Sequence, residues 1–171
     1  RAVIAHVQAE AQRLGCQGVV VTFDRHPASV VRPESAPKLL TDSDQKIELL
    51  AETGIDATFI VQFDEVASKE DPAAFVKRVL VDALGAKLIV VGEDFHFGYK
   101  RAGNVAMLRE LGRQFDFEVA PMKLVPRLDG VAEPVSSTAI RRALAGGQVE
   151  VAPQLLGRPF SVRGVVVNGD K

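Results

Sequence analysis

Two segments of this sequence place acidic, histidine and aromatic side chains directly after a run of apolar residues. Residues 18–23 lead into Asp24-Arg25-His26-Pro27, and residues 87–91 lead into the segment 92–98, which reads GEDFHFG. Such apolar runs are typical of buried parallel strands, and ligands bind beyond the carboxyl ends of those strands. A solvent loop does not need two phenylalanines, and a core segment disfavours two acids and a histidine. The mixture predicts a pocket wall on which an aromatic ring could stack.

A third segment carries the residue types of a phosphate-binding site. Residues 135–144 read VSSTAIRRAL, with three hydroxyl residues at the expected start of a helix and two arginines one turn later. A helix N-terminus offers free backbone N–H groups and the positive end of the helix dipole. Hydroxyls, amides and a guanidinium at one helix start favour binding of a phosphate. The residues concerned are Ser136, Ser137, Thr138, Arg141 and Arg142.

Each segment also has a purely structural interpretation. His26 could only shape the turn before Pro27, and Asp24 could bind the backbone of its own loop. The serines at 136–137 could be an ordinary helix cap followed by surface arginines.

The aromatic segment has alternatives of its own. Phe95 and Phe97 flank His96, so one ring could belong to the core while the other lines a pocket. A transition-metal site would draw on Asp24, His26, Asp94 and His96, but their spacing matches no compact metal motif.

The elements that must position these residues alternate between strands and helices. We expect strands at 18–23, 57–61, 87–91 and 117–120, and helices at 1–14, 42–53, 72–84, 104–114 and from Ser136 or Ser137 to 145. Thr41 or Ser43 is the expected cap of the second helix, and residues 24–40 are expected to form a long loop. Apolar strands alternating with helices predict an α/β fold with a parallel sheet.

The C-terminal stretch breaks this pattern. Residues 160–171 read FSVRGVVVNGDK, which predicts a β-strand at the start of a separate antiparallel domain. We place the boundary near residues 150–158.

The composition of the chain and the absence of several known motifs argue against several classes of protein. The chain has 171 residues and a net charge of −1, which gives no general attraction to nucleic acid or to an anionic membrane. No apolar run approaches the roughly 18 residues of a membrane span. The single cysteine, Cys16, favours a reducing cytoplasm. The GxxxxGK[ST], GxGxxG and GxSxG patterns are absent, which argues against P-loop kinases, standard dinucleotide-binding dehydrogenases and α/β-hydrolases.

These motifs, in this order, resemble one family. TFDRHP at 22–27, VGEDFHFG at 91–98 and VSSTAIRRAL at 135–144 are similar to the FMN adenylyltransferase module of bacterial bifunctional FAD synthetase (riboflavin kinase/FMN adenylyltransferase). PKLLT at 37–41 and GRPFSVRGVVVNGDK at 157–171 match the same family. The resemblance therefore covers nearly the whole chain.

The resemblance implies a fold and a domain division. The fold would be the Rossmann-like parallel sheet of the nucleotidylyltransferase (HxGH) superfamily, followed by the first strand of a β-barrel riboflavin kinase domain. Residues 1–152 would be the adenylyltransferase domain without its first strand and HxGH turn. Residues 153–171 would be a linker and the start of the kinase domain. The HxGH pattern does not occur here, and the kinase module stops after Lys171, so we expect a truncated chain of a larger protein.

The resemblance also implies an activity in FAD biosynthesis. The adenylyl group of ATP would pass to FMN with Mg²⁺ present, giving FAD and pyrophosphate, and the parent protein would also phosphorylate riboflavin. The partners would be these small molecules in the cytoplasm, without nucleic acid or membrane, and self-association stays open. No protein-bound metal is implied. The fragment alone would be inactive.

Site roles are implied residue by residue. By resemblance, the flavin side would comprise Asp24, His26, Pro27, Phe75, Asp94 and Phe97. The nucleotide side would comprise Gly92, Ser136, Ser137, Thr138 and Arg141, of which Ser137, Thr138 and Arg141 would take part in catalysis. Two residues depart from the family: Asp94 stands where asparagine is frequent, and Pro134 where relatives can carry arginine.

Two rival functions remain open at this point. One is a different nucleotidylyltransferase of the same superfamily, which would use ATP without depending on a flavin. The other is a noncatalytic module that binds a flavin or nucleotide.

Overall fold

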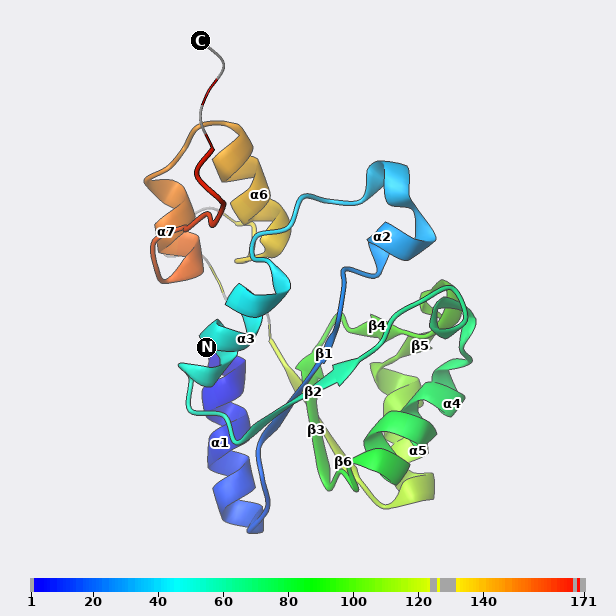
Figure 1. Cartoon of the computed structure of the whole chain (residues 1–171). Helices are drawn as coiled ribbons and strands as arrows, with labels where there is room; N and C mark the ends of the chain where they lie inside the picture. Colours follow the sequence, from blue (N-terminus) through cyan, green and yellow to red (C-terminus); the bar gives the residue numbers. More distant parts are fainter. Residues whose placement is uncertain (1, 124–125, 127–131, 168, 170–171) are drawn as a thin grey trace.

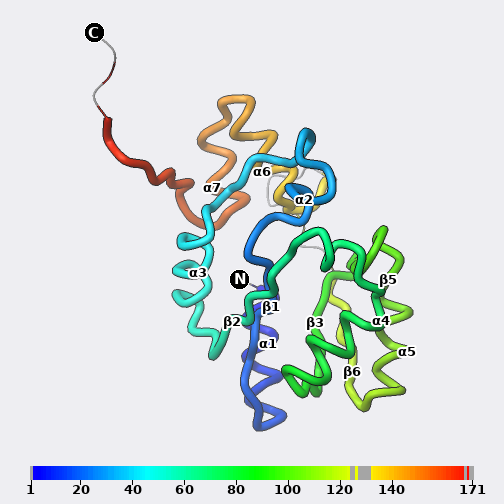
Figure 2. The backbone as a smooth tube through the Cα atoms, turned by 45° about the vertical axis from the view of Figure 1, so that its right-hand side comes forward, coloured from blue at the N-terminus to red at the C-terminus, as the bar shows by residue number. Residues whose placement is uncertain are grey.

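The computed structural model confirms an α/β fold built on parallel strands and describes residues 2–123, 126, 132–167 and 169. Strand β1 (Val19–Phe23) pairs in parallel with β2 (Ala57–Val61), with Val19 opposite Ala57. Strand β3 (Leu88–Gly92) pairs in parallel with β6 (Glu118–Met122). These are two separate two-stranded parallel sheets, which lie next to each other in Figure 2.

Helices lie on both sides of these strands (Figure 1). On one side are α1 (Ala2–Leu14) and α3 (Ser43–Ala51); on the other are α4 (Pro72–Phe75) and α5 (Val105–Phe115). The helix expected at 72–84 is present, but its second part, Val76–Ala83, is a π-helix. Helices α6 (Ser137–Ala145) and α7 (Val151–Leu156) follow β6, and α7 was not expected from the sequence.

The cap of α3 differs from the sequence prediction. Neither Thr41 nor Ser43 is the N-cap; Asp42 is, and its carboxylate accepts a hydrogen bond from the backbone N–H of Gln45. The Gln45 side chain in turn accepts one from the backbone N–H of Asp42. This reciprocal capping box satisfies two N–H groups at once, which a single hydroxyl at position 41 or 43 would not do.

Two regions for which no helix or strand was predicted contain short elements. Helix α2 (Ala28–Val31) and a 3₁₀ turn (Pro33–Ser35) interrupt the predicted loop at 24–40. After β3, the chain forms a small antiparallel hairpin from β4 (His96–Phe97) and β5 (Gly103–Asn104). Asn104 then caps α5, as expected, by accepting a hydrogen bond from the backbone N–H of Met107. Short 3₁₀ turns also occur at Ala67–Lys69 and Tyr99–Arg101.

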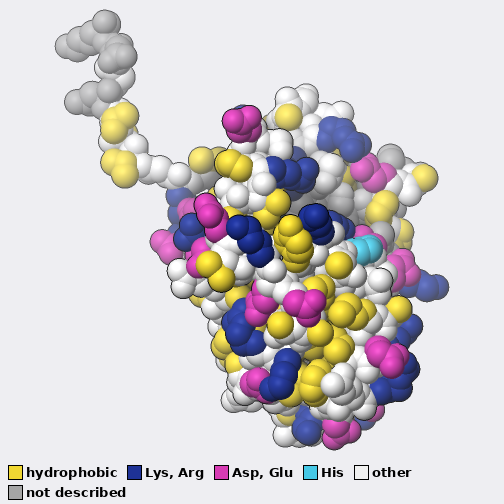
Figure 3. Space-filling view, turned by 90° about the vertical axis from the view of Figure 1, so that its right-hand side faces the viewer, with side chains coloured by type: hydrophobic (Ala, Val, Ile, Leu, Met, Phe, Trp, Pro, Cys, Tyr) yellow, Lys and Arg dark blue, Asp and Glu magenta, His cyan; other side chains and the backbone are white. Residues whose placement is uncertain are grey.

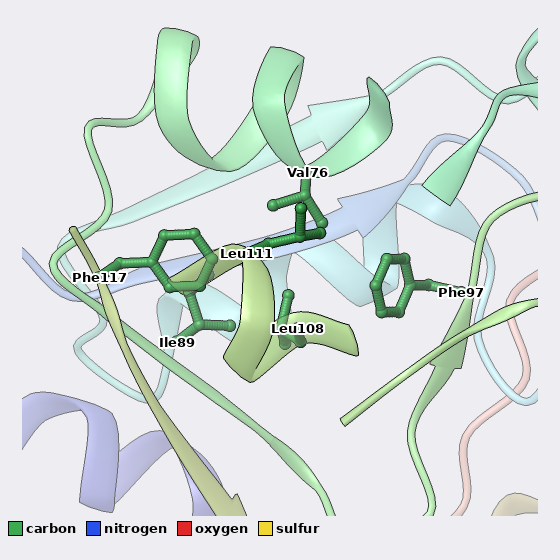
Figure 4. Packing of buried hydrophobic residues seen from close by; sticks show 6 residues of the cluster. All are labelled: Val76, Ile89, Phe97, Leu108, Leu111 and Phe117. Atoms are coloured by element: carbon green, nitrogen blue, oxygen red, sulfur yellow. The ribbon is translucent and has the colours of Figure 1, made fainter. Parts of the chain in front are cut away.

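The hydrophobic core lies between β3, the π-helix and α5. Figure 4 shows its six buried members, in which the ring of Phe97 points toward Leu108. The others are Val76, Ile89, Leu111 and Phe117. Because Phe97 comes from the hairpin after β3, this core fixes the loop that the sequence singled out as a pocket wall.

The strand expected at 160–171 is not formed in the described part of that segment. Residues 159–167 and 169 adopt no regular secondary structure, and Val165, Val166 and Val167 are 78–98% exposed. Figure 3 shows this end projecting from the body with hydrophobic side chains open to solvent. Two residues of α3 contact its first part: the side-chain amide of Gln45 donates to the hydroxyl and the backbone carbonyl of Ser161, and Glu48 pairs with Arg163. A strand needs a partner strand for its backbone hydrogen bonds, and here this segment has none among the described residues.

Within the described residues, no helix has the length and apolar character required to cross a bilayer.

Candidate functional site

A cavity of about 260 Å³ lies at the carboxyl end of β1. Three segments that are distant in sequence line it: the loop that follows β1, residues 39–43 and Lys46, which lead into α3 and form part of its first turn, and the start of α6. The structure therefore brings the DRHP segment, the PKLLT segment and the VSSTAIRR segment to one place. Its lining residues include Asp24, His26, Pro27, Lys46, Ser137 and Arg141.

Asp24 is held by contacts to three parts of the chain. Its carboxylate accepts a hydrogen bond from the backbone N–H of Phe63 (2.9 Å) and one from the guanidinium of Arg25 (3.0 Å). Its backbone carbonyl accepts one from the hydroxyl of Ser43 (3.1 Å). The hydrogen bond from the Phe63 N–H is the main reason why the pKa of Asp24 is below its usual value. The hydrogen bond and charge of Arg25 lower that pKa further. Asp24 thus stays ionised and ties the end of β1 to the end of β2.

His26 presents a neutral ring at the rim of the cavity. Its Nδ1 atom accepts a hydrogen bond from the backbone N–H of Ala28 (3.1 Å), so the neutral ring carries its proton on Nε2. Burial lowers the pKa of His26, and the nearby charges of Arg141 and Arg32 lower it further. The ring is therefore uncharged at neutral pH and can donate from Nε2.

Lys46 is a cavity residue that the sequence did not single out. From α3, its ammonium group donates a hydrogen bond to the backbone carbonyl of Phe23, the last residue of β1 (2.6 Å). Lys46 therefore adds a positive charge to the cavity wall that Asp24 and Arg141 also form. The PKLLT segment is the only nearby part of the sequence that was singled out. No pattern around residue 46 predicts the contact of Lys46 with Phe23.

Only some of the predicted phosphate-binding residues at the start of α6 line the cavity. Ser136 is the N-cap, and its hydroxyl oxygen accepts a hydrogen bond from the backbone N–H of Ala139 (3.1 Å). Ser137 and Arg141 line the cavity, whereas Ser136 and Thr138 do not. The Nε of Arg141 donates to the backbone carbonyl of Lys38 (2.7 Å), which joins α6 to the segment before α3.

The aromatic residues form a continuous row from the end of β1 to the end of β3. Phe23 packs edge-on against Phe63 with ring centroids 4.9 Å apart, and Phe75 lies 6.4 Å from both Phe23 and Phe97. Phe97 stacks on Phe95 at 5.4 Å. Phe97 is only 8% exposed and belongs to the core, and Phe95 packs against that core. Because both rings also line a second, larger cavity, the pair does not divide into one core ring and one pocket ring.

The predicted flavin-side residues divide between two cavities. Phe75 and Phe97 line a larger cavity of about 1540 Å³, which His26 and Pro27 also border, whereas Asp24 lines only the smaller one. Gly92, which was predicted on the nucleotide side, lines the larger cavity as well. Asp94 is exposed and lines neither cavity. A Cβ atom on Gly92 would lie 2.9 Å from the Asp94 carboxylate, so this glycine lets the Asp94 side chain fold back over the strand end.

The transition-metal alternative finds no support among the described residues. They contain no group of three or more His, Cys, Asp and Glu side chains placed to hold a metal ion. Instead, the Nδ1 atom of His96 lies 2.8 Å from the backbone carbonyl of Asp94.

Comparisons with known proteins agree with the resemblance that the motifs indicated. The family model for FAD synthetase matches residues 1–139. The bifunctional riboflavin kinase/FMN adenylyltransferase of Pseudomonas fluorescens is 37% identical over 100% of this chain and 54% of its own length. Those of Escherichia coli K12 and of Buchnera aphidicola from Schizaphis graminum are 33% and 35% identical over 100% and 90% of this chain.

The fold also matches a solved structure. A crystal structure described as a macrolide-efflux protein from Streptococcus pneumoniae superposes with a TM-score of 0.78 at 27% identity, over 99% of this chain and 55% of that one. The chain spans about half the length of the curated relatives it matches. Because the family model matches most of the chain, the chain belongs to the FAD synthetase family.

Proposed function

We propose that this chain is the FMN adenylyltransferase module of a bifunctional enzyme of FAD biosynthesis. Residues 1–152 form that module, and residues 153–171 form a linker and the start of a riboflavin kinase domain. The intact protein acts in the cytoplasm on FMN, on ATP as its Mg²⁺ complex, and on riboflavin. The observation that carries the proposal is the cavity at the carboxyl end of β1, where the DRHP, PKLLT and VSSTAIRR segments meet.

The reaction joins two polyanions and needs no protein nucleophile. An oxygen of the FMN phosphate attacks the α-phosphorus of ATP and forms the new P–O bond. The bond between the α-phosphorus and its bridging oxygen breaks, and pyrophosphate leaves with that electron pair. The protein's task is therefore alignment of the two substrates and stabilisation of negative charge.

The nucleotide side of the site is proposed at the start of α6. The helix dipole, the hydroxyl of Ser137 and the guanidinium of Arg141 all favour a phosphate there, whereas Thr138 lies outside the cavity lining. The contact of Arg141 to Lys38 uses one of its five N–H donors, so the side chain can hold a phosphate without leaving that position. Ser136 supports this arrangement by capping the helix.

The flavin side is proposed along the aromatic row. His26 and Pro27 border both cavities, and Phe75 lies between Phe23 and Phe97. In this proposal a ring system stacks beside Phe75, and the neutral His26 donates from Nε2. Asp24 acts mainly by holding the loop, since its carboxylate is already engaged by Phe63 and Arg25.

Mg²⁺ is assigned to the nucleotide in this proposal. In phosphoryl-transfer sites Mg²⁺ is usually held by substrate phosphates and one or two carboxylates. The described residues gather no larger set of metal ligands, so no step is attributed to a metal held by the protein.

The proposal is tested on the full-length protein with FMN, riboflavin or an unrelated phosphomonoester as acceptor and with Mg²⁺-ATP as donor. When FMN is the acceptor, FAD and pyrophosphate should appear in equal amounts. ATP turnover only with another acceptor would favour a different nucleotidylyltransferase. Flavin binding without turnover of ATP would indicate a noncatalytic module.

A further inference from the structure

Lys46 of helix α3 is a half-buried cation in the wall of the smaller cavity. Its Nζ atom donates a hydrogen bond to the backbone carbonyl of Phe23 (2.6 Å), and it forms no ion pair with any carboxylate in the part of the chain that the structure describes. An ammonium group has three N–H donors, so two of those of Lys46 remain for another acceptor. Because charged groups that are withdrawn from water are usually paired, this arrangement favours an anionic ligand beside Lys46.

The acidic side chains in the wall of this cavity are engaged elsewhere. The carboxylate of Asp24 accepts hydrogen bonds from a backbone N–H beyond the end of β2 and from the neighbouring guanidinium. The carboxylate of Asp42 caps α3. Arg141, like Lys46, forms no ion pair with a described carboxylate. Among the described residues, two positive charges without an acidic partner therefore line this cavity, one from α3 and one from α6.

The size and lining of the smaller cavity suit the phosphate end of a substrate rather than a whole substrate. Its volume of about 260 Å³ lies below the roughly 300–1,000 Å³ of pockets that enclose most of a drug-sized ligand. The hydroxyl residues Thr41, Ser43 and Ser137 line it together with the two cations. Every ring of the aromatic row lines the larger cavity, and only Phe23 also lines the smaller one. A flavin ring is therefore better placed in the larger cavity, which leaves the smaller one for phosphate.

We propose that Lys46 and Arg141 together bind the diphosphate end of the nucleotide, so that Lys46 is a second binding residue for the pyrophosphate that leaves. This inference rests on the proposed function. As the bond between the α-phosphorus and its bridging oxygen breaks, the electron pair stays on pyrophosphate, and cations held at the diphosphate stabilise that charge. The compact ammonium group of a lysine is a common ligand of phosphate oxygens.

A purely structural role of Lys46 makes a different prediction. In that case the ammonium group would only join α3 to the end of β1 through the carbonyl of Phe23. Such a contact requires an N–H donor, whereas binding of a diphosphate also requires positive charge. Lys46→Gln keeps N–H donors and removes the charge, and Lys46→Arg keeps both. The two substitutions therefore separate the two roles.

The proposal is tested by calorimetric titration of the full-length protein with magnesium pyrophosphate. Lys46→Gln should weaken pyrophosphate binding by at least about tenfold, whereas Lys46→Arg should stay within about threefold of the wild type. Lys77→Gln is the matched control, because it removes the same charge at an exposed position that lines neither cavity. FMN, titrated separately, should bind all of these variants as tightly as it binds the wild type.

A second measurement uses the wild-type protein and does not depend on the folding of the glutamine variant. Lysine is labelled with ¹³C at Cε, and the NMR signal of Lys46 is identified by its loss in Lys46→Arg. This signal should shift when magnesium pyrophosphate is added, whereas the signal of Lys77 should not.

Several outcomes would overturn the proposal. They are a Lys46 signal that does not move, pyrophosphate binding that is equal in the glutamine and arginine variants, and no pyrophosphate binding by the wild type. Weaker binding of FMN with unchanged binding of pyrophosphate would also overturn it, by assigning Lys46 to the phosphate of FMN. FAD formation together with any of these results would refute this inference alone. Pyrophosphate binding that depends on Lys46, in a protein that makes no FAD, would refute the proposed function alone.

Discussion

The guanidinium of Arg141 donates a hydrogen bond from Nε to the backbone carbonyl of Lys38, although 103 positions separate the two residues (2.7 Å). This contact joins the start of α6 to the segment ahead of α3, and with the end of β1 these segments enclose the smaller cavity. Arg141 therefore lies in the same cavity wall as His26, Lys46 and Ser137.

Replacing Arg141 by alanine in the full-length protein should lower the rate of adenylyl transfer by at least about tenfold, or about 1.4 kcal/mol. The substitution removes a guanidinium from the proposed phosphate site, whereas FMN binding should persist. Arg142→Ala is the matched control, because Arg142 pairs with Glu133 and lines neither cavity. Steady-state FAD formation and FMN titration measure the two effects. Equal activity of both variants would remove Arg141 from the site.

Contacts of this kind mark the limit of what the sequence predicts. The strands at 19–23 and 88–92 were predictable because β-branched runs have a simple local signature. The bond from Lys46 to the carbonyl of Phe23 joins residues 23 positions apart, and only the folded arrangement of α3 and β1 brings them together. The two-residue strands at His96–Phe97 and Gly103–Asn104 are too short to show any periodicity.

The absence of a strand among the described residues of 160–171 has a similar cause. The valines at 165–167 have strong β-propensity, but propensity describes how side chains fit a sheet surface and does not supply a partner strand. The cap of α3 could have been predicted better, since Asp42 and Gln45 have the spacing of a capping box.

Phe75→Leu should weaken FMN binding by about 1–3 kcal/mol, the range found for stacking of a base on an aromatic side chain. Phe75 lines the larger cavity and lies within the aromatic row, and leucine keeps much of its apolar contact with the core. Phe115→Leu is the control, because Phe115 also packs against the core but lines neither cavity. FMN dissociation constants from fluorescence titration would compare them. The stacking role fails if Phe75→Leu binds FMN as tightly as Phe115→Leu does.

Phe97 is less suited to a binding test because it belongs to the core. Sequence alone predicts that Phe97→Ala weakens FMN binding, but removing a buried phenylalanine also costs about 3–5 kcal/mol of stability. We expect Phe97→Ala to lower the urea midpoint of unfolding whether or not FMN is present. An unchanged midpoint without FMN would mean that the ring does not contribute to the core as Figure 4 shows.

Gly103→Ala should lower the free energy of unfolding by about 1–3 kcal/mol, because the added methyl group would overpack the hairpin. Its Cβ would lie 2.7 Å from the ring of Phe97. Gly164→Ala is a suitable control, since a Cβ there meets nothing within 4 Å. Urea unfolding followed by circular dichroism measures both variants. If the two unfold at the same denaturant concentration, Gly103 does not pack against Phe97 as described.

The protonation of His26 should make the protein less stable as the pH falls below about 6.5. Burial, Arg141 and Arg32 lower the pKa of His26 in the folded state, so the unfolded chain binds the proton more readily. The stabilising contribution is complete above the unfolded value of about 6.5 and is lost toward and below the lower folded pKa. His26→Asn should therefore show a shallower loss of stability than the wild type when urea midpoints are compared between pH 8 and pH 5. Parallel curves would show that His26 is not the group responsible.

We propose that the full-length protein transfers the adenylyl group of ATP to FMN. The most direct measurement supplies FMN and Mg²⁺ with ATP labelled with ³²P at either the α or the γ position, and then separates the products. We predict that the α label appears in FAD and that the γ label appears in pyrophosphate, with both products dependent on FMN. Absence of α label from the flavin, with ATP consumed or not, would contradict the account.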